Sequence, residues 1–505
     1  MVYLVGAGPG DPGLITQKGI DLLKIADVVV YDSLINTKLL NHCRKKTRFI
    51  FVGKKSSRES ITQKEINDIL IKSSKGNMVV VRLKGGDPFL FGRGGEEAEA
   101  LTNEGILVEI VPGVSSISAV PGYSGVPLTH RKYNSSFAVI TGHENPDKAK
   151  SSINWKAISS LDTLVFLMSL KNLSSITKKL ISNKMPRDTP VIITSWGTLP
   201  TQNSVVGTLS DITDKVKSNK SITTPAVILV GKIVNLRNKI NWFEKKPLFG
   251  KNIIITRASE QSTGLRDKLY SYGANVIELP TIKTVPVKSW KKIDSSIKNF
   301  ELYDYIIFTS VNGVKYFFER IKKNKLDSRI FKNKTIITTG DKTAAELNKH
   351  GLHSDITPKK YTAEGIITSL KSHDLKNKNV LIPRAKVARN ILPDTLRNLK
   401  AKVTVLDCYV TVLPVTKVEF KQDIINKLKK GEIDLITFTS SSTFTNLKKM
   451  LGKDINHLNN TIISSIGPIT SMTIKENGFQ PRIQAKKHTV EGLIDEIIVH
   501  FTTSD

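Results

Sequence analysis

A glycine-rich loop at residues 84–97 is the stretch of the first half best suited to bind a ligand. It follows the apolar segment 78–81 and leads into a helical pattern that begins at Glu96. A strand, a glycine loop and a helix in this order present backbone N–H groups to an anion or polar ligand. Glycine permits that close approach because it has no Cβ. Five glycines and two basic residues favour a binding loop over a plain turn.

A second glycine turn, residues 6–13, fits the G-x-G-x-x-G pattern of dinucleotide sites, with Asp32 at a suitable distance to hold a ribose. We reject this interpretation because Pro9 and Pro12 remove two N–H groups that a pyrophosphate would need. Both turns contain Gly-Asp-Pro. We therefore expect the two loops to face one ligand.

Two groups that can exchange protons follow apolar segments. Asp32 ends the predicted strand 28–31, and Lys54 follows the predicted strand 48–52. Ligands of open α/β sheets bind at the carboxyl ends of the strands. A carboxylate and an ammonium there can act as base and acid if burial adjusts their pKa values, although an ordinary surface ion pair explains them equally well.

Further polar groups follow in the same half. Ser115 and Ser116 lie at a strand-to-helix turn after residues 108–111, and residues 130–132 place a histidine beside two cations. His130 by itself fits a structural role better than a catalytic one.

The second half repeats itself. Residues 308–313 recur at 438–443, and residues 362–366 recur at 489–493, with offsets of 130 and 127 residues. The motif at 338–343 recurs at 464–470. Near-equal offsets predict two similar lobes of roughly 130 residues. Because each lobe alternates strand and helix, we expect doubly wound parallel sheets.

The chemistry of this half is sparse: no metal set, triad or activated nucleophile is evident. Hydroxyl groups and helix N-termini suit carboxylate binding. Ordinary N-caps explain each instance singly, but recurrence in both lobes favours a shared ligand. The candidate substrate-binding positions are Thr309, Ser310, Thr339, Gly340, Thr343, Ser440, Ser441, Gly467 and Thr470.

The length and pattern indicate an α/β protein of more than one domain. A charged segment broken by proline, residues 244–250, reads as a linker. We expect one domain at 1–243, in which a second α/β unit starts at Phe137, and another at 251–505. Within residues 251–505, we expect one lobe to comprise residues 251–284 and 413–505 and the other to comprise residues 285–412.

Composition narrows the class of protein. Two distant cysteines, Cys43 and Cys408, suggest neither a disulfide framework nor a metal site, which fits a reducing, cytoplasmic compartment. Neither a signal peptide nor an apolar run of membrane-spanning length is apparent. The net charge of +31 permits nucleic-acid binding, but the lysines are scattered without a basic stripe. Solvated lysines or a substrate with several carboxylates explain the charge better.

The first 243 residues resemble the tetrapyrrole methylase family, and within it the uroporphyrinogen-III C-methyltransferases. The matching segments are 6–13, 30–32, 51–54, 82–97, 127–131, 141–143, 224–226 and 241–243. The resemblance implies a two-lobed α/β enzyme, a homodimer through this half, that binds S-adenosylmethionine as co-substrate. The cofactor-binding residues that it implies are Pro9, Gly85, Gly86, Asp87, Leu90, Ser115, Ser116, Met168, Gly197 and Ala226.

In this family the nucleophile is an electron-rich pyrrole carbon, which attacks the sulfonium methyl, after which a proton leaves the ring system. The resemblance makes Asp32 the proton acceptor and Lys54 the proton donor. Candidates for binding the substrate's acetate and propionate groups are Arg82, Lys84, Arg93, Arg131 and Lys132. Ser169 in place of the usual glycine, and Ser115-Ser116 in place of a Thr-Ala type pair, put the cofactor affinity in question.

Residues 250–505 are similar to uroporphyrinogen-III synthases, whose motifs are more diffuse. The matching features are Thr309-Ser310, Asn312-Gly313, Pro383-Arg384, Arg389, Tyr409, Thr439-Ser440, Gly467, Thr470 and Glu491-Gly492. The resemblance implies two flavodoxin-like lobes in which linear hydroxymethylbilane closes with loss of water. The bilane can close unaided to the wrong isomer, so such an enzyme mainly holds a conformation. Tyr409 is the candidate for handling a proton or hydroxyl, or else a packed hinge aromatic.

Together the halves predict consecutive steps: synthesis of uroporphyrinogen III, then methylation at C-2 and C-7 to precorrin-2, on the sirohaem or cobalamin branch. We expect no metal, no nucleic-acid partner and no membrane partner. One alternative is another tetrapyrrole C-methyltransferase fused to an inactive synthase-like half. The other is a basic nucleic-acid-binding protein built on flavodoxin-like lobes.

Overall fold

The computed structural model describes residues 1–53, 61–142, 152–257 and 259–503. The chain forms two compact units. The first comprises residues 1–252, 267–276 and 498–505, and the second comprises residues 253–266 and 277–497. Each unit contains α/β sheets, so the predicted α/β class is confirmed.

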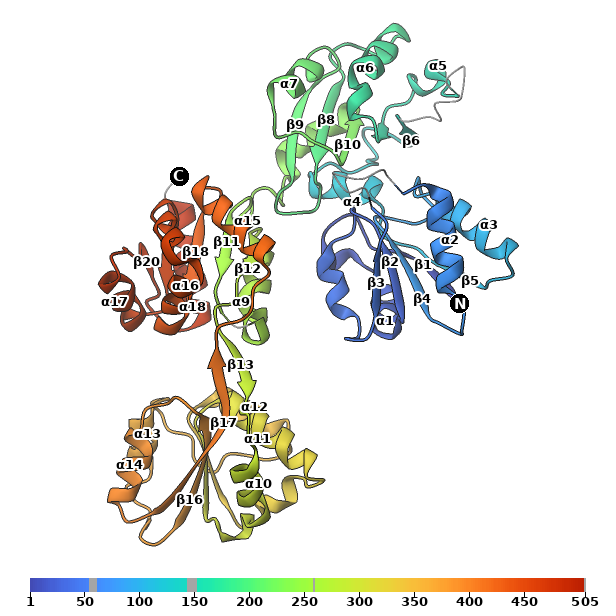
Figure 1. The fold of residues 1–505 in the computed structure, drawn as a ribbon. Helices are drawn as coiled ribbons and strands as arrows, with labels where there is room; N and C mark the ends of the chain where they lie inside the picture. Colours follow the sequence, from blue (N-terminus) through green and yellow to red (C-terminus); the bar gives the residue numbers. More distant parts are fainter. Residues whose placement is uncertain (54–60, 143–151, 258, 504–505) are drawn as a thin grey trace. The chain divides into compact units, whose positions relative to one another are not determined.

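The first sheet is entirely parallel, with strand order β3-β2-β4-β1-β5. Its strands are β1 (Val2–Gly6), β2 (Val28–Tyr31), β3 (Arg48–Phe51), β4 (Val80–Lys84) and β5 (Val108–Val111). Its helices are α1 (Gln17–Ile25), α2 (Gln63–Ser73), α3 (Gly94–Asn103) and α4 (Ser116–Tyr123). Alternate residues of β1, β2 and β4 pack on α1 on one face and on α2 and α3 on the other (Figure 1). Burial on both faces explains the continuous apolar strands.

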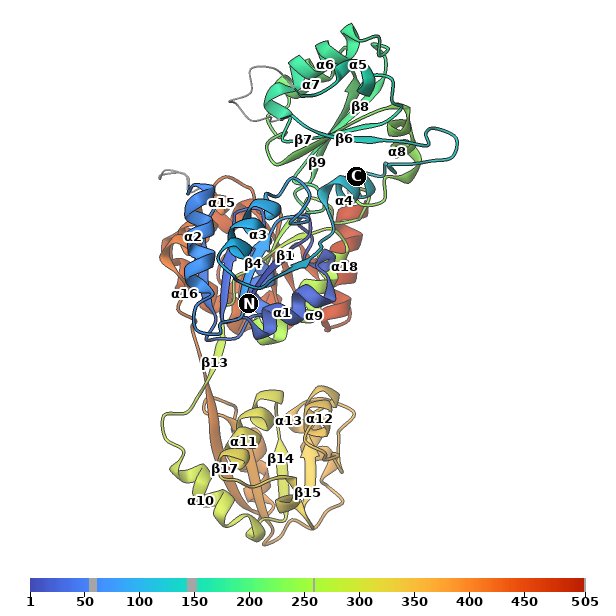
Figure 2. The same cartoon turned by 90° about the vertical axis from the view of Figure 1, so that its right-hand side faces the viewer.

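The second sheet is mixed, with order β6-β7-β10-β8-β9, and only β6 and β7 pair in parallel. Its strands are β6 (Ala138–Thr141), β7 (Leu164–Leu167), β8 (Pro190–Ser195), β9 (Asn203–Thr208) and β10 (Ala226–Val230). The helices are α5 (Trp155–Ile158), α6 (Leu173–Ser182), α7 (Ile212–Ser218) and α8 (Arg237–Ile240). Apolar residues of α5, α6 and α7 cover one face of this sheet (Figure 2).

The third sheet has the order β12-β11-β18-β19-β20. Its strands are β11 (Asn252–Ile255), β12 (Asn275–Glu278), β18 (Leu435–Phe438), β19 (Ile462–Ser465) and β20 (Ile483–Gln484). The helices are α9 (Ser259–Ser271), α15 (Val418–Lys429), α16 (Ser441–Leu451), α17 (Pro468–Glu476) and α18 (Val490–Thr503). β11 pairs in parallel with β18, which lies about 180 residues later in the chain.

The fourth sheet has the order β13-β17-β16-β14-β15. Its strands are β13 (Lys283–Pro286), β14 (Tyr305–Phe308), β15 (Thr335–Thr338), β16 (Asn379–Ala385) and β17 (Lys402–Val412). The helices are α10 (Lys291–Lys298), α11 (Val311–Lys323), α12 (Asp341–Asn348), α13 (Ala363–Ser369) and α14 (Ile391–Asn398). The sheet departs from the expected parallel arrangement at β13, which pairs antiparallel with β17 because one strand enters this lobe and the other leaves it.

The predicted linker, residues 244–250, packs within the first unit. The Leu248 N–H donates to the Tyr272 carbonyl (3.0 Å), and the Phe243 and Phe249 rings meet edge to face. Residues 267–276 therefore group with the first unit, although the sequence indicated a boundary at residue 251.

Candidate functional site

Three backbone segments of the first unit converge at the carboxyl ends of β1 and β4. Gly8 and Gly86 exchange hydrogen bonds, with the Gly86 N–H donating to the Gly8 carbonyl at 2.7 Å. A Cβ on Gly113 would lie 2.3 Å from the Gly86 carbonyl oxygen and 2.6 Å from the Gly6 Cα. Only glycine fits such spacing, so the two predicted loops do lie together.

Asp87 and the α4 N-terminus complete this arrangement. Asp87 Oδ2 accepts from the Gly113 N–H (3.0 Å), and its Oδ1 accepts from the Phe89 N–H (2.8 Å). Ser115 is the N-cap of α4, where its hydroxyl accepts from the Ile117 N–H, and Ser116 begins the helix. The predicted cofactor residues Gly85, Gly86, Asp87, Ser115 and Ser116 are thus brought to one place, while the nearby Leu90 side chain is exposed.

Of the remaining cofactor candidates, Pro9 lies in the turn after β1, and Met168, Gly197 and Ala226 lie at strand ends and loops of the second sheet. Pro9 precedes Gly10, and the Asp11 N–H after it donates to the Thr198 hydroxyl (3.0 Å). Gly197 lies against Val120 of α4, where a Cβ would be 2.6 Å from both methyl groups. Met168, half exposed with a φ of 54°, follows Leu167, which pairs with Val227 next to Ala226. The loops of both sheets therefore meet around α4.

A buried charge cluster lies behind the end of β2. It consists of Asp32, Arg82, Lys84 and Glu97. Arg82 Nη2 lies 3.3 Å from Asp32 Oδ2, and Lys84 Nζ lies 2.7 Å from Glu97 Oε1. Burial, the largest effect, lowers the pKa of Lys84. Asp32 retains 23% exposure of its side chain, so it is the member of the cluster that solvent reaches.

The charge cluster changes the interpretation of two predicted substrate ligands. Arg82 and Lys84 are 3% and 5% exposed, and both pair with Glu97 Oε1, while Arg82 also pairs with Asp32. This environment does not match that expected for ligands of substrate carboxylates, because their charges are compensated inside the protein. The sequence reasoning missed Glu97 as a site residue; the polar residues at alternate positions of the buried strand β4 were a signal for such a partner.

The other predicted groups of this half are placed differently. Arg93 is exposed and pairs with Glu96 (2.6 Å), whereas Arg131 and Lys132 are exposed in the segment before β6. His130 Nδ1 accepts from the Lys132 N–H at 3.2 Å, which is a local structural contact. Lys54 lies outside the described residues.

Ser169, the departure from the family pattern, is buried. Its hydroxyl donates to the Leu167 carbonyl at 2.7 Å. A Cβ on the facing Gly142 would lie 2.1 Å from the Ser169 hydroxyl oxygen. The serine therefore occupies space that a glycine at position 142 leaves free.

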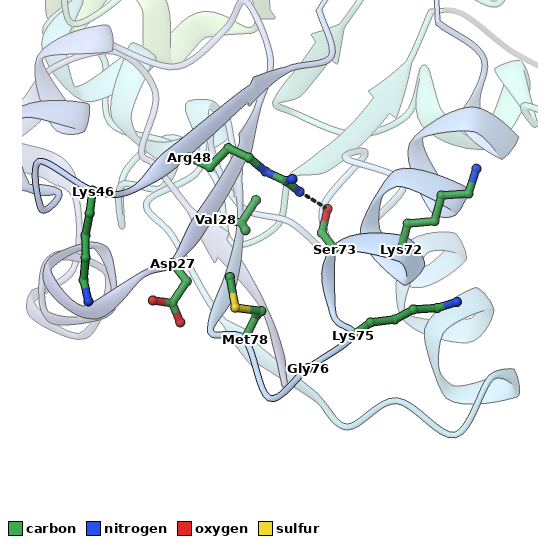
Figure 3. Close-up of a pocket in the computed structure, with 9 residues that line it drawn as sticks. All are labelled: Asp27, Val28, Lys46, Arg48, Lys72, Ser73, Lys75, Gly76 and Met78. Carbon is green, nitrogen blue, oxygen red and sulfur yellow. Dashed lines mark hydrogen bonds between the residues drawn. The ribbon is translucent and has the colours of Figure 1, made fainter.

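A cavity of about 480 Å³ opens at the opposite edge of the first sheet, where β2, β3 and β4 begin (Figure 3). Its lining includes Asp27, Lys46, Arg48, Lys72 and Lys75. Arg48 donates to the Ser73 hydroxyl at 3.4 Å, while the Lys72 and Lys75 side chains extend away from Asp27 (Figure 3). None of the predicted site residues lines this cavity.

In the second unit, Tyr409 of β17 and Ser310 are brought together. Their hydroxyl oxygens lie 3.0 Å apart, and Ser310 also caps α11 by accepting from the Gly313 N–H. Tyr409 is buried and stacks on Tyr316, with ring centroids 5.5 Å apart. Burial, the main cause, raises the pKa of Tyr409, so the phenol remains a proton donor at neutral pH.

Equivalent positions of the repeat have equivalent contacts. Gly340 packs against the ring of Tyr361, and Gly467 packs against that of His488. Thr362 and Thr489 cap their helices in the same way, accepting from the N–H groups of Gly365 and Gly492. Thr339, Thr343, Ser440, Ser441 and Thr470 lie beside the corresponding turns, and those at 343 and 470 are buried.

A smaller cavity of about 250 Å³ lies in this unit. Its lining comes from segments of both the third and the fourth sheet, and includes Arg257, Val311, Lys342, Val490 and Glu491. Val311 and Val490 are the first residues of α11 and α18, so two helix N-termini border a cavity that also has two cations. None of these residues was among the predicted substrate ligands, although Val311 follows Ser310 directly.

Within the parts of the chain that the structure describes, no group of three or more His, Cys, Asp or Glu side chains is arranged to hold a metal ion. Among the same residues, no helix combines the length and apolar character needed to cross a membrane.

Comparison with known proteins identifies both halves. Residues 1–213 match the family of tetrapyrrole (corrin/porphyrin) methylases, and residues 264–495 match the family of uroporphyrinogen-III synthase HemD. A Ruminiclostridium josui relative, named porphyrin biosynthesis protein HemD, is 38% identical over 502 residues, which cover 98% of this chain and 97% of the relative.

Two further relatives match less of the chain. The uroporphyrinogen-III C-methyltransferase of Bacillus subtilis is 44% identical over 352 residues, covering 70% of this chain and 72% of the relative. A solved uroporphyrin-III C-methyl transferase from Thermus thermophilus, complexed with S-adenyl homocysteine, is 35% identical, with a TM-score of 0.40 over 46% of this chain and 99% of its own. The chain therefore belongs to the tetrapyrrole methylase family through its first half and to the uroporphyrinogen-III synthase family through its second half.

Proposed function

We propose that this chain is a bifunctional enzyme of tetrapyrrole biosynthesis. Its second half cyclises hydroxymethylbilane to uroporphyrinogen III with loss of water. Its first half transfers two methyl groups from S-adenosylmethionine to C-2 and C-7, giving precorrin-2 for the sirohaem or cobalamin branch. The two families in one chain, and a relative of the same length named for porphyrin biosynthesis, support consecutive steps.

The convergence of the three glycine-containing segments beside Asp32 is the observation that carries the methylase proposal. The close backbone contacts of Gly6 and Gly113, which leave no room for a Cβ, hold the three segments together. A Cβ on Gly86, in contrast, would meet its nearest neighbours, in Ser115 and Ser116, only at 3.8–4.0 Å, so the main chain there leaves room for a cofactor. S-adenosylmethionine supplies the electrophilic methyl group when it is bound. The residues proposed to hold it are Pro9, Gly85, Gly86, Asp87, Leu90, Ser115, Ser116, Met168, Gly197 and Ala226.

Proton transfer is assigned to Asp32, whose side chain is 23% exposed and so is reached by solvent. Arg82 holds one oxygen, and the Leu34 N–H donates to the other at 3.0 Å. A carboxylate oriented in this way can accept the proton that leaves the methylated ring. Lys54 remains the proposed donor on the family pattern alone. Of the predicted cations, exposed Arg93, Arg131 and Lys132 are the better candidates for binding the substrate's carboxylates.

In the second half, we assign the ring closure to the smaller cavity, which is bordered by two helix N-termini and lined by Arg257 and Lys342, together with the Ser310–Tyr409 hydroxyl pair that precedes Val311. Tyr409 is a neutral hydroxyl that can donate to the departing hydroxyl group of the bilane. Arg257 and Lys342 suit the substrate's carboxylates. Tyr409 contacts the Ser310 hydroxyl and the Tyr316 ring, which are neither strong acids nor strong bases, and this fits an enzyme whose task is to hold a conformation.

The assignment includes three further expectations. The methylase activity is placed in residues 1–243 and the synthase activity in residues 251–505, joined at 244–250. A homodimer through the methylase half and a cytoplasmic location are expected from the family and from the cysteine usage.

The experiment is to give the purified chain hydroxymethylbilane with and without S-adenosylmethionine, and to identify the tetrapyrroles by isomer and mass. Isomer III without the cofactor and a dimethylated product with it are the expected results. Isomer I alone would refute the synthase assignment. Failure to bind S-adenosylmethionine would refute the methylase assignment and favour the nucleic-acid-binding alternative. Asp32→Ala should abolish methylation and leave cyclisation intact.

A further inference from the structure

Glu97 is the most deeply buried member of the charge cluster, with no solvent exposure. Its Oε1 accepts from Lys84 Nζ at 2.7 Å and from Arg82 Nε at 3.3 Å, and Gln63 Nε2 lies 3.4 Å away. Its Oε2 has no hydrogen-bond partner among the described residues. Burying a carboxylate costs desolvation free energy, even when one of its oxygens pairs with two cations. Packing alone therefore does not explain a glutamate at this position.

The guanidinium of Arg82 links Glu97 to the solvent-facing carboxylate. Its Nε is held by Glu97, its Nη1 donates to the Leu83 carbonyl (3.2 Å), and its Nη2 reaches Asp32 Oδ2 (3.3 Å). A guanidinium is rigid and planar, so fixing Nε and Nη1 also fixes the direction of Nη2. The position of Asp32 therefore depends on a residue of α3 that does not touch it.

The cluster is electrically balanced. Arg82 and Lys84 are the two cations, and Asp32 and Glu97 are the two anions. Outside it, Arg93 and Glu96 pair with each other at the exposed start of α3. Loss of the Glu97 charge would leave the single carboxylate of Asp32 facing two buried cations.

We infer that Glu97 is a positioning residue for methyl transfer, which orients Asp32 and sets the charge around it through Arg82 and Lys84. This inference rests on the proposed role of Asp32 as proton acceptor. It gives Arg82 and Lys84 a role inside the protein in place of contact with the substrate's carboxylates.

Glu97→Gln tests the inference, because it keeps the shape of the side chain and removes its charge. The kcat and KM of methylation are measured across a pH range, with calorimetric titration of S-adenosylhomocysteine on the same preparation. We expect kcat to fall roughly 10- to 100-fold, with KM and the S-adenosylhomocysteine affinity changed less than about twofold. Removing the Glu97 carboxylate raises the net positive charge of the cluster, so the acid limb of the kcat profile should move to lower pH.

Two variants provide the comparison. Glu99→Gln, on an exposed position of the same helix, should behave as wild type. Glu97→Asp keeps the charge, so it should restore the wild-type acid limb and part of kcat. A wild-type kcat and acid limb in Glu97→Gln would overturn the inference. So would a loss of kcat in Glu97→Gln and Glu97→Asp alike without movement of the acid limb, because that result reports packing alone.

Two further variants keep the outcome decisive. If Glu97→Gln does not fold, the charge-balanced Lys84→Met/Glu97→Gln variant takes its place, and a wild-type kcat there overturns the inference. Asp32→Asn is measured in parallel. If it methylates at the wild-type rate, the proposed role of Asp32 fails and the inference with it; if it is inactive while Glu97→Gln is normal, only the inference fails.

Discussion

Gly113 lies where three backbone segments of the first unit meet, and replacing it by alanine tests whether this contact organises the proposed cofactor site. The added Cβ would lie 2.3 Å from the Gly86 carbonyl oxygen and 2.6 Å from the Gly6 Cα. Both atoms belong to the backbone, so neither can rotate away. Relief of the contact requires the segments to separate by about 1 Å, the kind of rearrangement that overpacking forces.

The size of the effect follows from this displacement. Overpacking of a close-packed region costs about 1–3 kcal/mol of unfolding free energy. A shift of about 1 Å in a group that positions a substrate can slow a reaction on the order of 100-fold. The hydrogen bond from Gly113 to Asp87 (3.0 Å) would also be stretched. We expect Gly113→Ala to unfold at lower urea concentration, to bind S-adenosylhomocysteine more weakly and to methylate on the order of 100-fold more slowly.

Urea unfolding, calorimetric titration of S-adenosylhomocysteine and the methylation rate provide the three measurements. Gly122→Ala is the matched control, because it lies in the following helix α4 and its Cβ would meet nothing within 4 Å. That control should keep its affinity and change the unfolding free energy by less than about 1 kcal/mol. If Gly113→Ala were as stable and as tightly binding as wild type, the reasoning from backbone contact would be refuted.

Three other predictions concern single side chains. Tyr409→Phe keeps the stacking on Tyr316 and loses the hydrogen bond with Ser310. We expect the unfolding free energy to fall by about 1 kcal/mol and chromatography to show a smaller fraction of isomer III. An unchanged isomer ratio would exclude a role for the hydroxyl. Burial raises the pKa of Cys43 to about 11 and that of Cys408 to about 12, so both thiols are protonated at pH 8. Both should therefore react with Ellman's reagent far more slowly in the native protein than in denaturant. Fast labelling of both thiols in the native state would contradict this prediction. Ser169→Gly removes a buried hydrogen bond and should lower the unfolding free energy by about 1 kcal/mol. The affinity for S-adenosylhomocysteine should stay within about twofold of the wild-type value. A large change in that affinity would place the hydroxyl in the cofactor site.

Much of the architecture could be predicted from short segments of the chain. Apolar strands such as residues 28–31 and 80–83 alternate with amphipathic helices. The spacing of apolar residues that distinguishes them is a local property of the sequence, so it can be recognised without knowing the fold. The paired glycine turns were predicted to face one ligand because both contain Gly-Asp-Pro, and they do lie together, at the edge where the parallel strands β1 and β4 end. The internal repeat of the second half likewise predicted equivalent caps at Thr362 and Thr489.

Strand direction was less accessible. The second sheet is mostly antiparallel, and β13 runs against β17, although their segments read like those of the parallel sheets. An apolar strand carries little information about its neighbour's direction, because direction depends on the path of the connecting chain.

Local sequence was enough to predict which residue types end the strands, where the turns need glycine, and that the two halves of the chain resemble two families. The partners of the charged side chains, in contrast, became known from the fold. From the sequence, Arg82 and Lys84 were predicted to bind the substrate's carboxylates, and Glu97 stands where the start of a helix favours a carboxylate. Packing of α3 against β4 buries all three and joins them to Asp32, because burial depends on which elements cover one another and sequence spacing does not encode that.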